Sequence, residues 1–300
     1  MRIIDTFLFS EPHEKELLLT KFHLEDLGVD TWVILESPYT FQGEYKGLHV
    51  SKILNEDSRF QPFIDKIIVI NPAKDFVPLH GSINDEGKNF DRENAQRAMA
   101  LGLIHELDDN DWVMISDTDE MADFSDQERK EAINTVLGVL EQSNQYIVKL
   151  QRQRYWFDFD NKCFLPNIHV PFVKAGLIKQ NAQYMMARHF DHIHKIGFAR
   201  PVLFEYSYCF PSFEDVWRKK CTYSHTGFTE ESVRIALECN HWPRSELRGE
   251  KVGQEPYDFF EKVELTEENS PKYVRENLEK LRTNIVNPNY KEARVARYGV

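Results

Sequence analysis

Residues 3–36 read IIDTFLFSEPHEKELLLTKFHLEDLGVDTWVILE, and this stretch holds a strand, a helix and a second strand in succession. Ile3–Phe9 is an apolar run of strand length that ends just before Pro12. Apolar residues three to four apart then predict a helix that stops near Gly28. Residues 31–35 (TWVIL) form the second predicted strand. A strand, a helix and a strand in this order predict two parallel strands with the helix packed on one face.

The same alternation continues through the first half of the chain. Further strands are predicted at 66–70 (KIIVI) and 112–116 (WVMIS), and further helices at 91–107 and 125–140, where Ser125 and Glu128 fit a capping box. The predicted class is therefore α/β, with a Rossmann-like, mostly parallel sheet flanked by helices.

The second half has a different character. Residues 146–210 are aromatic-rich and strand-like, and a short helix is predicted from Thr229 to Glu238. The chain ends in an amphipathic helix for which Ser270 is the expected cap, with an apolar stripe that runs to Ile285. We therefore expect one domain in two halves, 1–145 and 146–262, followed by an extension over 263–300.

Composition narrows the function. The chain has 300 residues, of which 37 are Lys or Arg and 49 are Asp or Glu, for a net charge of −12. That balance argues against nucleic acid or an anionic membrane as the main partner, because both require a basic surface. The apolar runs are too short to span a bilayer, and the N-terminus lacks the pattern of a signal peptide. The four cysteines (Cys163, Cys209, Cys221 and Cys239) form no CxxC pair, so we expect reduced thiols in a cytoplasmic protein.

Two carboxylates follow directly after the predicted buried strand at 112–116. In an extended segment Asp117 and Asp119 project to the same side, at the strand end where open parallel sheets bind ligands. Two carboxylates at one point suit Mg²⁺ or Mn²⁺, with phosphate oxygens completing the coordination. Such a cation would neutralise a diphosphate leaving group.

The Asp-x-Asp pattern occurs at two further places. Residues 109–111 (DND) precede a strand and are expected to form a solvated turn. Residues 158–160 (DFD) follow the aromatic run 155–157 (YWF) and are expected at an exposed hairpin end. Position thus singles out Asp117 and Asp119.

Three segments together resemble glycosyltransferase family 17. They are residues 3–43, which continue after the second strand with ESPYTFQG, residues 93–97 (ENAQR) and residues 115–120 (ISDTDE). Their order and spacing agree with the family over about the first 125 residues. Beyond residue 150, CTYSH at 221–225 and NHWPRSE at 240–246 are the nearest counterparts of the family pattern, and both depart from it.

The resemblance implies a GT-A-like domain and an inverting, metal-dependent transfer. A sugar, with N-acetylglucosamine as one candidate, would pass from a nucleoside-diphosphate sugar, foremost a UDP-sugar, to an acceptor hydroxyl. The implied cofactor is Mn²⁺ or Mg²⁺, and the acceptor is a glycan, a glycolipid or a polysaccharide precursor. The half 1–145 would bind the nucleotide sugar, 146–262 would bind the acceptor, and 263–300 would be a helical extension.

The resemblance and the strand positions together give a set of candidate site residues. The candidate metal ligands are Asp117, Asp119 and His225; the candidate donor-binding residues are Glu36, Glu93, Arg97 and Asp117; the candidate bases are Glu214, Asp215 and Glu246. Each has a structural alternative: a half-buried histidine at 225, a helix cap at Glu36, a solvated i,i+4 pair of Glu93 with Arg97, and surface acids at the three base positions.

Other interpretations stay open at this stage. The histidines of RHFDHIHK at 188–195 match no zinc pattern, and with Arg188 and Lys195 they line a phosphate or sugar cleft or serve structure. The same carboxylates also suit a metal-dependent nucleotidyltransferase or phosphohydrolase, although the chain lacks GxxxxGK[ST] and GxGxxG. A non-catalytic glycan-binding protein is the third alternative.

Overall fold

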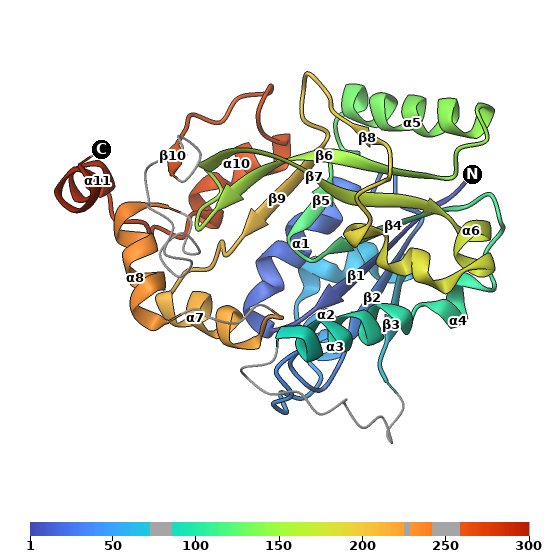
Figure 1. Cartoon of the computed structure of the whole chain (residues 1–300), viewed down its shortest axis with the longest axis horizontal. Helices are drawn as coiled ribbons and strands as arrows, with labels where there is room; N and C mark the ends of the chain where they lie inside the picture. The colour runs from blue at the N-terminus through green and yellow to red at the C-terminus, as the bar shows by residue number, and fades with distance from the viewer. Residues whose placement is uncertain (73–85, 225–228, 242–258, 300) are drawn as a thin grey trace.

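The structure is a computed structural model that describes residues 1–72, 86–224, 229–241 and 259–299. Its centre is one ten-stranded sheet in the order β3-β2-β1-β4-β7-β6-β9-β5, with β10 paired to β7 and β8 paired to β6. The N- and C-termini lie at opposite ends of the molecule (Figure 1).

The first half of the sheet is parallel. Its strands are β1 (Ile3–Phe9), β2 (Thr31–Glu36), β3 (Ile67–Ile70) and β4 (Trp112–Asp117). Each strand pairs in parallel with its neighbour, and β1 lies between β2 and β4. The predicted strands and their parallel pairing are confirmed, as is the α/β class.

Alternate side chains of the parallel strands enter two separate cores. Phe7 and Trp32 pack on one face against Phe22 of α1 (Lys15–Glu25), together with α2 and α5. Leu8 and Val33 pack on the other face with α4, α6 and η3. Burial of both faces explains why these strands are continuous apolar runs.

The second half of the sheet is mixed. Its strands are β5 (Glu120–Ala122), β6 (Ile147–Trp156), β7 (Asn161–Lys174), β8 (Lys195–Ile196), β9 (Leu203–Ser207) and β10 (Phe260–Lys262). β7 runs antiparallel to both β4 and β6, whereas β6 and β9 are parallel. Because β7 pairs directly with β4, the sheet continues without a break across the expected division at residue 145.

The helices cover the two faces and the end of the sheet (Figure 1). Besides α1 they are η1 (Pro12–Glu14), α2 (Val50–Glu56), η2 (Ser58–Lys66), α3 (Glu86–Ala98), α4 (Leu101–Ile104), α5 (Gln127–Gln142), α6 (Ala175–Gln180), η3 (Ala182–His189), α7 (Phe213–Thr222), α8 (Glu230–Cys239), α10 (Lys272–Leu281) and α11 (Tyr290–Tyr298). The helix expected at 91–107 is split into α3 and α4.

Two predicted helix caps are wrong. Asp126, and not Ser125, caps α5, because its side chain accepts from the Arg129 amide while the Ser125 hydroxyl donates to Asp123 at 2.6 Å. Ser270 is fully buried and gives no side-chain cap to α10, which ends at Leu281, before Ile285.

The expected exposure of the two other Asp-x-Asp motifs is also wrong in part. Asp158 is fully buried, because the amide of Thr283 and the Lys262 ammonium both donate to it. Asp111 is 3% exposed and accepts from the guanidinium of Arg2. None of the four cysteines forms a disulfide in the described ranges.

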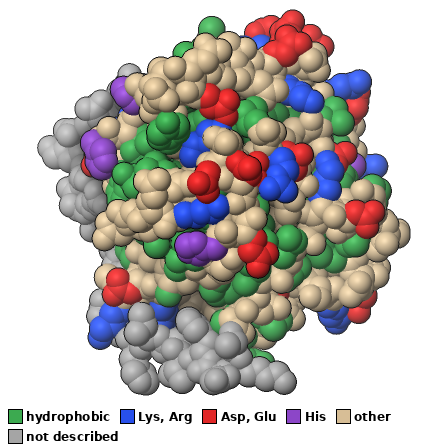
Figure 2. All heavy atoms as spheres, turned by 90° about the vertical axis from the view of Figure 1, so that its right-hand side faces the viewer, with side chains coloured by type: hydrophobic (Ala, Val, Ile, Leu, Met, Phe, Trp, Pro, Cys, Tyr) green, Lys and Arg blue, Asp and Glu red, His purple; other side chains and the backbone are tan. Residues whose placement is uncertain are grey.

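The described surface has no broad area of one charge sign on the face shown in Figure 2, where acidic and basic side chains are intermixed. Within the described ranges, no helix has both the length and the apolar character needed to cross a bilayer.

Candidate functional site

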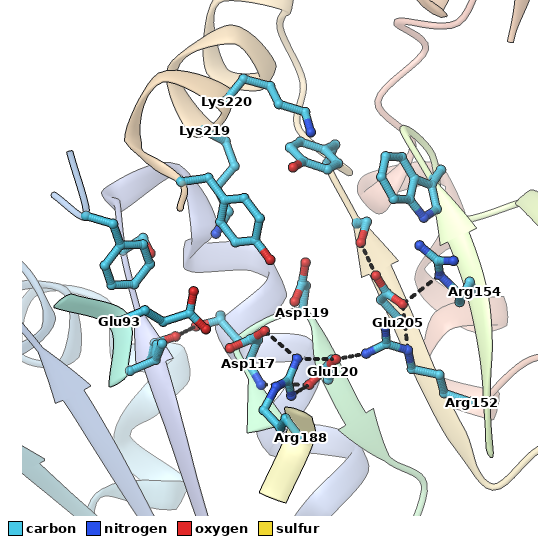
Figure 3. A pocket seen from close by; sticks show the side chains of 18 residues that line it. Glu93, Asp117, Asp119, Glu120, Arg152, Arg154, Arg188, Glu205, Lys219 and Lys220 are labelled. Carbon is cyan, nitrogen blue, oxygen red and sulfur yellow. Dashed lines mark hydrogen bonds and ion pairs between the residues drawn. The ribbon is translucent and has the colours of Figure 1, made fainter. Parts of the chain in front are cut away.

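A cavity of about 310 Å³ opens at the carboxyl ends of β1 and β4 and extends over β6 and β9 (Figure 3). Its lining consists of Leu8, Ser10, Phe41, Glu93, Asp117, Thr118, Asp119, Glu120, Arg152, Arg154, Trp156, Arg188, Glu205, Ser207, Tyr208, Lys219, Lys220 and Tyr223. This volume lies at the lower end of the range for small-molecule sites. The cavity brings the predicted Glu93, Asp117 and Asp119 together.

Hydrogen bonds from buried side chains fix the turn that carries Asp117 and Asp119. β4 ends at Asp117 and β5 begins at Glu120, and the hydroxyl of Thr118 donates to the Leu8 carbonyl at 2.6 Å. The fully buried Lys21 donates to the Glu120 carbonyl at 2.5 Å and pairs with Asp5 at 2.6 Å. The turn is therefore preorganised, which a site for a charged ligand requires.

Asp117 lies between two arginines. Its Oδ1 accepts from Arg97 at 2.6 Å and its Oδ2 accepts from Arg188 at 2.9 Å. Burial alone would raise the pKa of Asp117, but the guanidinium groups of Arg188 and Arg97 hold it well below its usual range. Asp117 is thus ionised, and both of its oxygens are engaged.

Asp119 differs from Asp117 in its contacts and in the direction of its pKa shift. Its carboxylate lies in the middle of the cavity in Figure 3 and has no hydrogen-bond or ion-pair partner among the described residues. Burial raises the pKa of Asp119 to about 7; Lys219 opposes this, and the carboxylates of Glu205 and Asp117 add to it. Asp119 is therefore a carboxyl group whose ionised form is disfavoured by burial and only partly stabilised by Lys219.

Glu93 and Arg97 form the predicted i,i+4 pair, with Nη2 of Arg97 3.0 Å from Oε1 of Glu93. The pair is buried and does not lie on a solvated face, since Arg97 is 1% and Glu93 is 5% exposed. Arg97 also donates to the Ser116 carbonyl at 2.9 Å, and Ser224 donates to Glu93 at 2.5 Å. This pair therefore joins α3 to the end of β4.

The charged residues that β6 and β9 contribute to the cavity were not predicted from the sequence. Nε of Arg152 and Nε of Arg154 lie 2.8 Å and 2.9 Å from Oε2 of Glu205, and Ser207 donates to the same carboxylate. Arg152 also pairs with Glu120. Arginines two apart in a strand lie on the same face of the sheet. The two arginines of RQRYW at 152–156 and the single acid of LFEYS at 203–207 were therefore the sequence signal that could have predicted this cluster.

Arg188 connects the carboxylates of Asp117 and Glu120. It donates to Asp117 and, through both terminal nitrogens, to Glu120. Within the segment 188–195, Arg188 lines the cavity, whereas none of the three histidines does.

The remaining predicted residues lie elsewhere. Glu36 accepts from the amides of His49 and Val50 at 2.6 and 3.1 Å, so it caps α2 and does not line the cavity. Glu214 and Asp215 lie in the first turn of α7, outside the cavity lining. His225 and Glu246 lie outside the described residues.

The carboxylates of the cavity differ in how well they suit a divalent cation. Within the described residues, no group of three or more His, Cys, Asp or Glu side chains could hold a metal ion. Asp119 fits as a single protein ligand, because its carboxylate oxygens have no hydrogen-bond or ion-pair partner among the described residues. Asp117 fits less well in this arrangement, because arginines occupy both of its oxygens.

Comparisons with known proteins gave one family and several distant structures. The sequence model of glycosyltransferase family 17 matches residues 1–236. No curated protein matches the chain. Mannose-6-phosphate isomerase from Helicobacter pylori is 13% identical over 63% of this chain and 78% of its own, with a TM-score of 0.36. The cytidylyltransferase IspD from Francisella tularensis is 12% identical over 66% and 89%, with a TM-score of 0.32. An active-site mutant of LgtC is 10% identical over 68% and 86%, with a TM-score of 0.34.

Proposed function

The chain belongs to glycosyltransferase family 17, and from this premise we propose that it transfers a sugar from a nucleoside-diphosphate sugar to an acceptor hydroxyl with inversion. A UDP-sugar, with N-acetylglucosamine among the candidate sugars, is the proposed donor. The acceptor is proposed to be a glycan, a glycolipid or a polysaccharide precursor. Membership of this family argues against a nucleotidyltransferase, a phosphohydrolase and a glycan-binding protein without activity.

The observation that supports the proposal is the position of Asp117 and Asp119 in a cavity at the carboxyl end of β4. That edge of a parallel sheet is where open α/β folds bind nucleotides. Arg188 and Lys219 line the same cavity and would bind donor phosphates, since guanidinium and ammonium groups form charge-assisted hydrogen bonds with them.

Asp119 is the proposed ligand of Mn²⁺ or Mg²⁺, and His225 stays a proposed second ligand. When bound, the cation would neutralise the negative charge that develops on the leaving diphosphate. Asp117 has another role here: its two ion pairs hold Arg97 and Arg188 in place, and Glu93 fixes Arg97 from the other side. These residues would orient the nucleotide.

The proposed base is a carboxylate within hydrogen-bond reach of the acceptor hydroxyl. Glu246 remains a candidate for this base. Glu214 and Asp215 are weaker candidates, because they lie outside the cavity lining.

The test is Asp119→Asn, with Asp109→Asn, at an exposed aspartate of another Asp-x-Asp motif, as the matched control. We expect Asp119→Asn to lower Mn²⁺-dependent turnover of a UDP-sugar about a hundredfold, because it removes the carboxylate that lacks a partner. Its melting temperature should not fall, since Asn replaces a charge that burial disfavours. Asp109, whose side chain is 72% exposed, should change neither quantity.

Full metal-dependent turnover by Asp119→Asn would contradict the assignment of the metal ligand. Release of nucleotide without transfer to any acceptor would favour a phosphohydrolase.

A further inference from the structure

The charged side chains of the cavity are divided unequally between its two sides. We call Glu93, Asp117, Asp119 and Glu120 the carboxylate side; Arg188 and Lys219 face it. We call Arg152, Arg154, Lys220 and Glu205 the cation side, since the described lining contributes three cations and one carboxylate there. In Figure 3, Glu93 and Asp117 lie on one flank of the cavity, and Arg152, Arg154 and Glu205 lie on the other.

The cation side is a built site and not a group of surface charges. Arg152, Arg154, Lys220 and Glu205 are each less than 8% exposed, although they line the cavity. Glu205 fixes both arginines through its carboxylate. Burial lowers the pKa of Arg152 to about 10, with Glu205 opposing and Arg154 adding to the effect, so this guanidinium is a cation at neutral pH.

Aromatic rings lie beside two of these cations. Cζ of Arg154 is 5.3 Å from the ring centroid of Trp156, and Nζ of Lys220 is 5.9 Å from the same centroid. Nζ of Lys220 is also 4.2 Å from the ring centroid of Tyr208. Trp156 and Tyr208 both line the cavity, with their ring centroids 5.0 Å apart. A ring with both an apolar face and a polar group suits the mixed surface of a sugar.

We propose that the cation side binds an acidic group on the acceptor sugar, so that the acceptor is a saccharide that carries a carboxylate or a phosphate. Lys220 and Arg154 bind the acidic group, and Trp156 contacts the sugar ring. This inference rests on the proposed function, because it takes the other side of the cavity to be the donor site.

The position of the cation side separates it from the donor phosphates. Arg152, Arg154 and Glu205 come from β6 and β9, whereas Asp117 and Asp119 follow β4. On the carboxylate side, the side chain of Asp119 has no hydrogen-bond or ion-pair partner among the described residues, which suits a nucleotide bound together with a divalent cation. Two arginines and a lysine in one part of the cavity lining suit a ligand that brings its own negative charge, since charge-assisted hydrogen bonds are stronger than neutral ones.

The test compares sugars that differ in one group. Binding of methyl β-D-glucuronide and methyl β-D-glucoside, and of glucose 6-phosphate and glucose, is measured by titration calorimetry on the whole chain. The proteins are the wild type, Lys220→Gln and the control Lys272→Gln, whose lysine is 73% exposed on α10. Binding of UDP with Mn²⁺ is measured on the same samples.

We expect the wild type to bind at least one acidic sugar about tenfold more tightly than its neutral partner. Lys220→Gln should remove that difference, and Lys272→Gln should keep it. A preference for the glucuronide would assign a carboxylate, and a preference for glucose 6-phosphate would assign a phosphate.

Two results would overturn the inference. One is equal binding of the acidic and neutral members of both pairs by the wild type. The other is an equal loss of UDP and acidic-sugar affinity in Lys220→Gln, because the cations would then serve the donor. Failure of the proposed function would appear separately, as absence of UDP-sugar turnover in the wild type.

Discussion

The carboxylate side and the cation side of the cavity are both made of buried charges, but they are held in different ways. On the carboxylate side, Glu93, Asp117 and Glu120 are each paired with an arginine, and Asp119 alone has no hydrogen-bond or ion-pair partner among the described residues. On the cation side, one carboxylate, Glu205, holds two arginines. The first arrangement leaves a place for a cation and the second favours an anion.

The difference shows that charge type alone does not define a site. Buried ion pairs whose members satisfy one another position the backbone but add little net binding. What a site binds follows from the charge that the surrounding pairs leave uncompensated. By this criterion Asp119 is the central residue of the cavity, although Asp117 makes more contacts. Three variants test this comparison.

The largest effect is expected below the carboxylate side, at Lys21. Its ammonium is fully buried and lies 2.6 Å from Asp5 and 3.1 Å from Glu25. Lys21→Met leaves two buried carboxylates without their cation, so the free energy of unfolding should fall by about 3–5 kcal/mol in urea denaturation. Lys15→Met, at an ion pair whose lysine is 39% exposed, should cost less than about 1 kcal/mol. Equal costs in the two variants would show that the buried cluster does not support the turn.

The next effect concerns His13 of η1, whose ring packs edge-on against Phe210 with the ring centroids 4.4 Å apart. Its Nε2 is buried without a hydrogen-bond partner among the described residues, and burial lowers the pKa of His13 to about 4. Below about pH 6.5 this histidine is protonated in the unfolded chain but stays neutral in the folded protein. The free energy of unfolding therefore falls as the pH falls from 6.5 to 4. The loss is about 3 kcal/mol at most.

His13→Phe keeps the edge contact and removes the titrating group. The acid loss of stability between pH 7 and 4, measured by urea denaturation, should therefore be smaller in this variant than in the wild type. An unchanged acid loss would contradict the burial of a neutral histidine there.

The smallest effect is expected at Arg188, which holds both Asp117 and Glu120. Lysine keeps the positive charge but cannot form the two-pronged hydrogen bonds of a guanidinium, so Arg188→Lys should weaken UDP-sugar binding about tenfold. The control is Arg200→Lys, a forked arginine on Asp126 away from the cavity, which should leave donor binding unchanged. An equal affinity for the UDP-sugar in the wild type and in Arg188→Lys would contradict a role of Arg188 in donor binding.

The parallel half of the fold was accessible from sequence. The strands at 3–9, 31–36 and 112–117 are buried on both faces over almost their whole length, and such strands read as apolar runs. The rule that ligands bind at the carboxyl ends of strands then located Asp117 and Asp119 without further information. Local pattern and local environment coincide in this half.

The other half was less accessible, because its site depends on contacts between distant segments. Arg188 meets Asp117 from 71 residues away, and Arg154 meets Glu205 from 51 residues away. Periodicity predicts which face a residue lies on, but it does not predict the partner across that face. The burial of Asp158 has the same origin, since Thr283 covers it from 125 residues away.

The central claim is that the carboxylate side binds a nucleotide sugar together with a divalent cation. Thermal unfolding with UDP-, GDP-, CMP- and TDP-sugars, each with and without Mn²⁺, tests it most directly. A ligand at a hundredfold its dissociation constant adds about 2.7 kcal/mol of stability, which appears as a higher melting temperature. The account predicts a rise with one nucleotide class, foremost UDP, that requires Mn²⁺ and disappears in Asp119→Asn. A rise of equal size without Mn²⁺, or one that survives in Asp119→Asn, would contradict it.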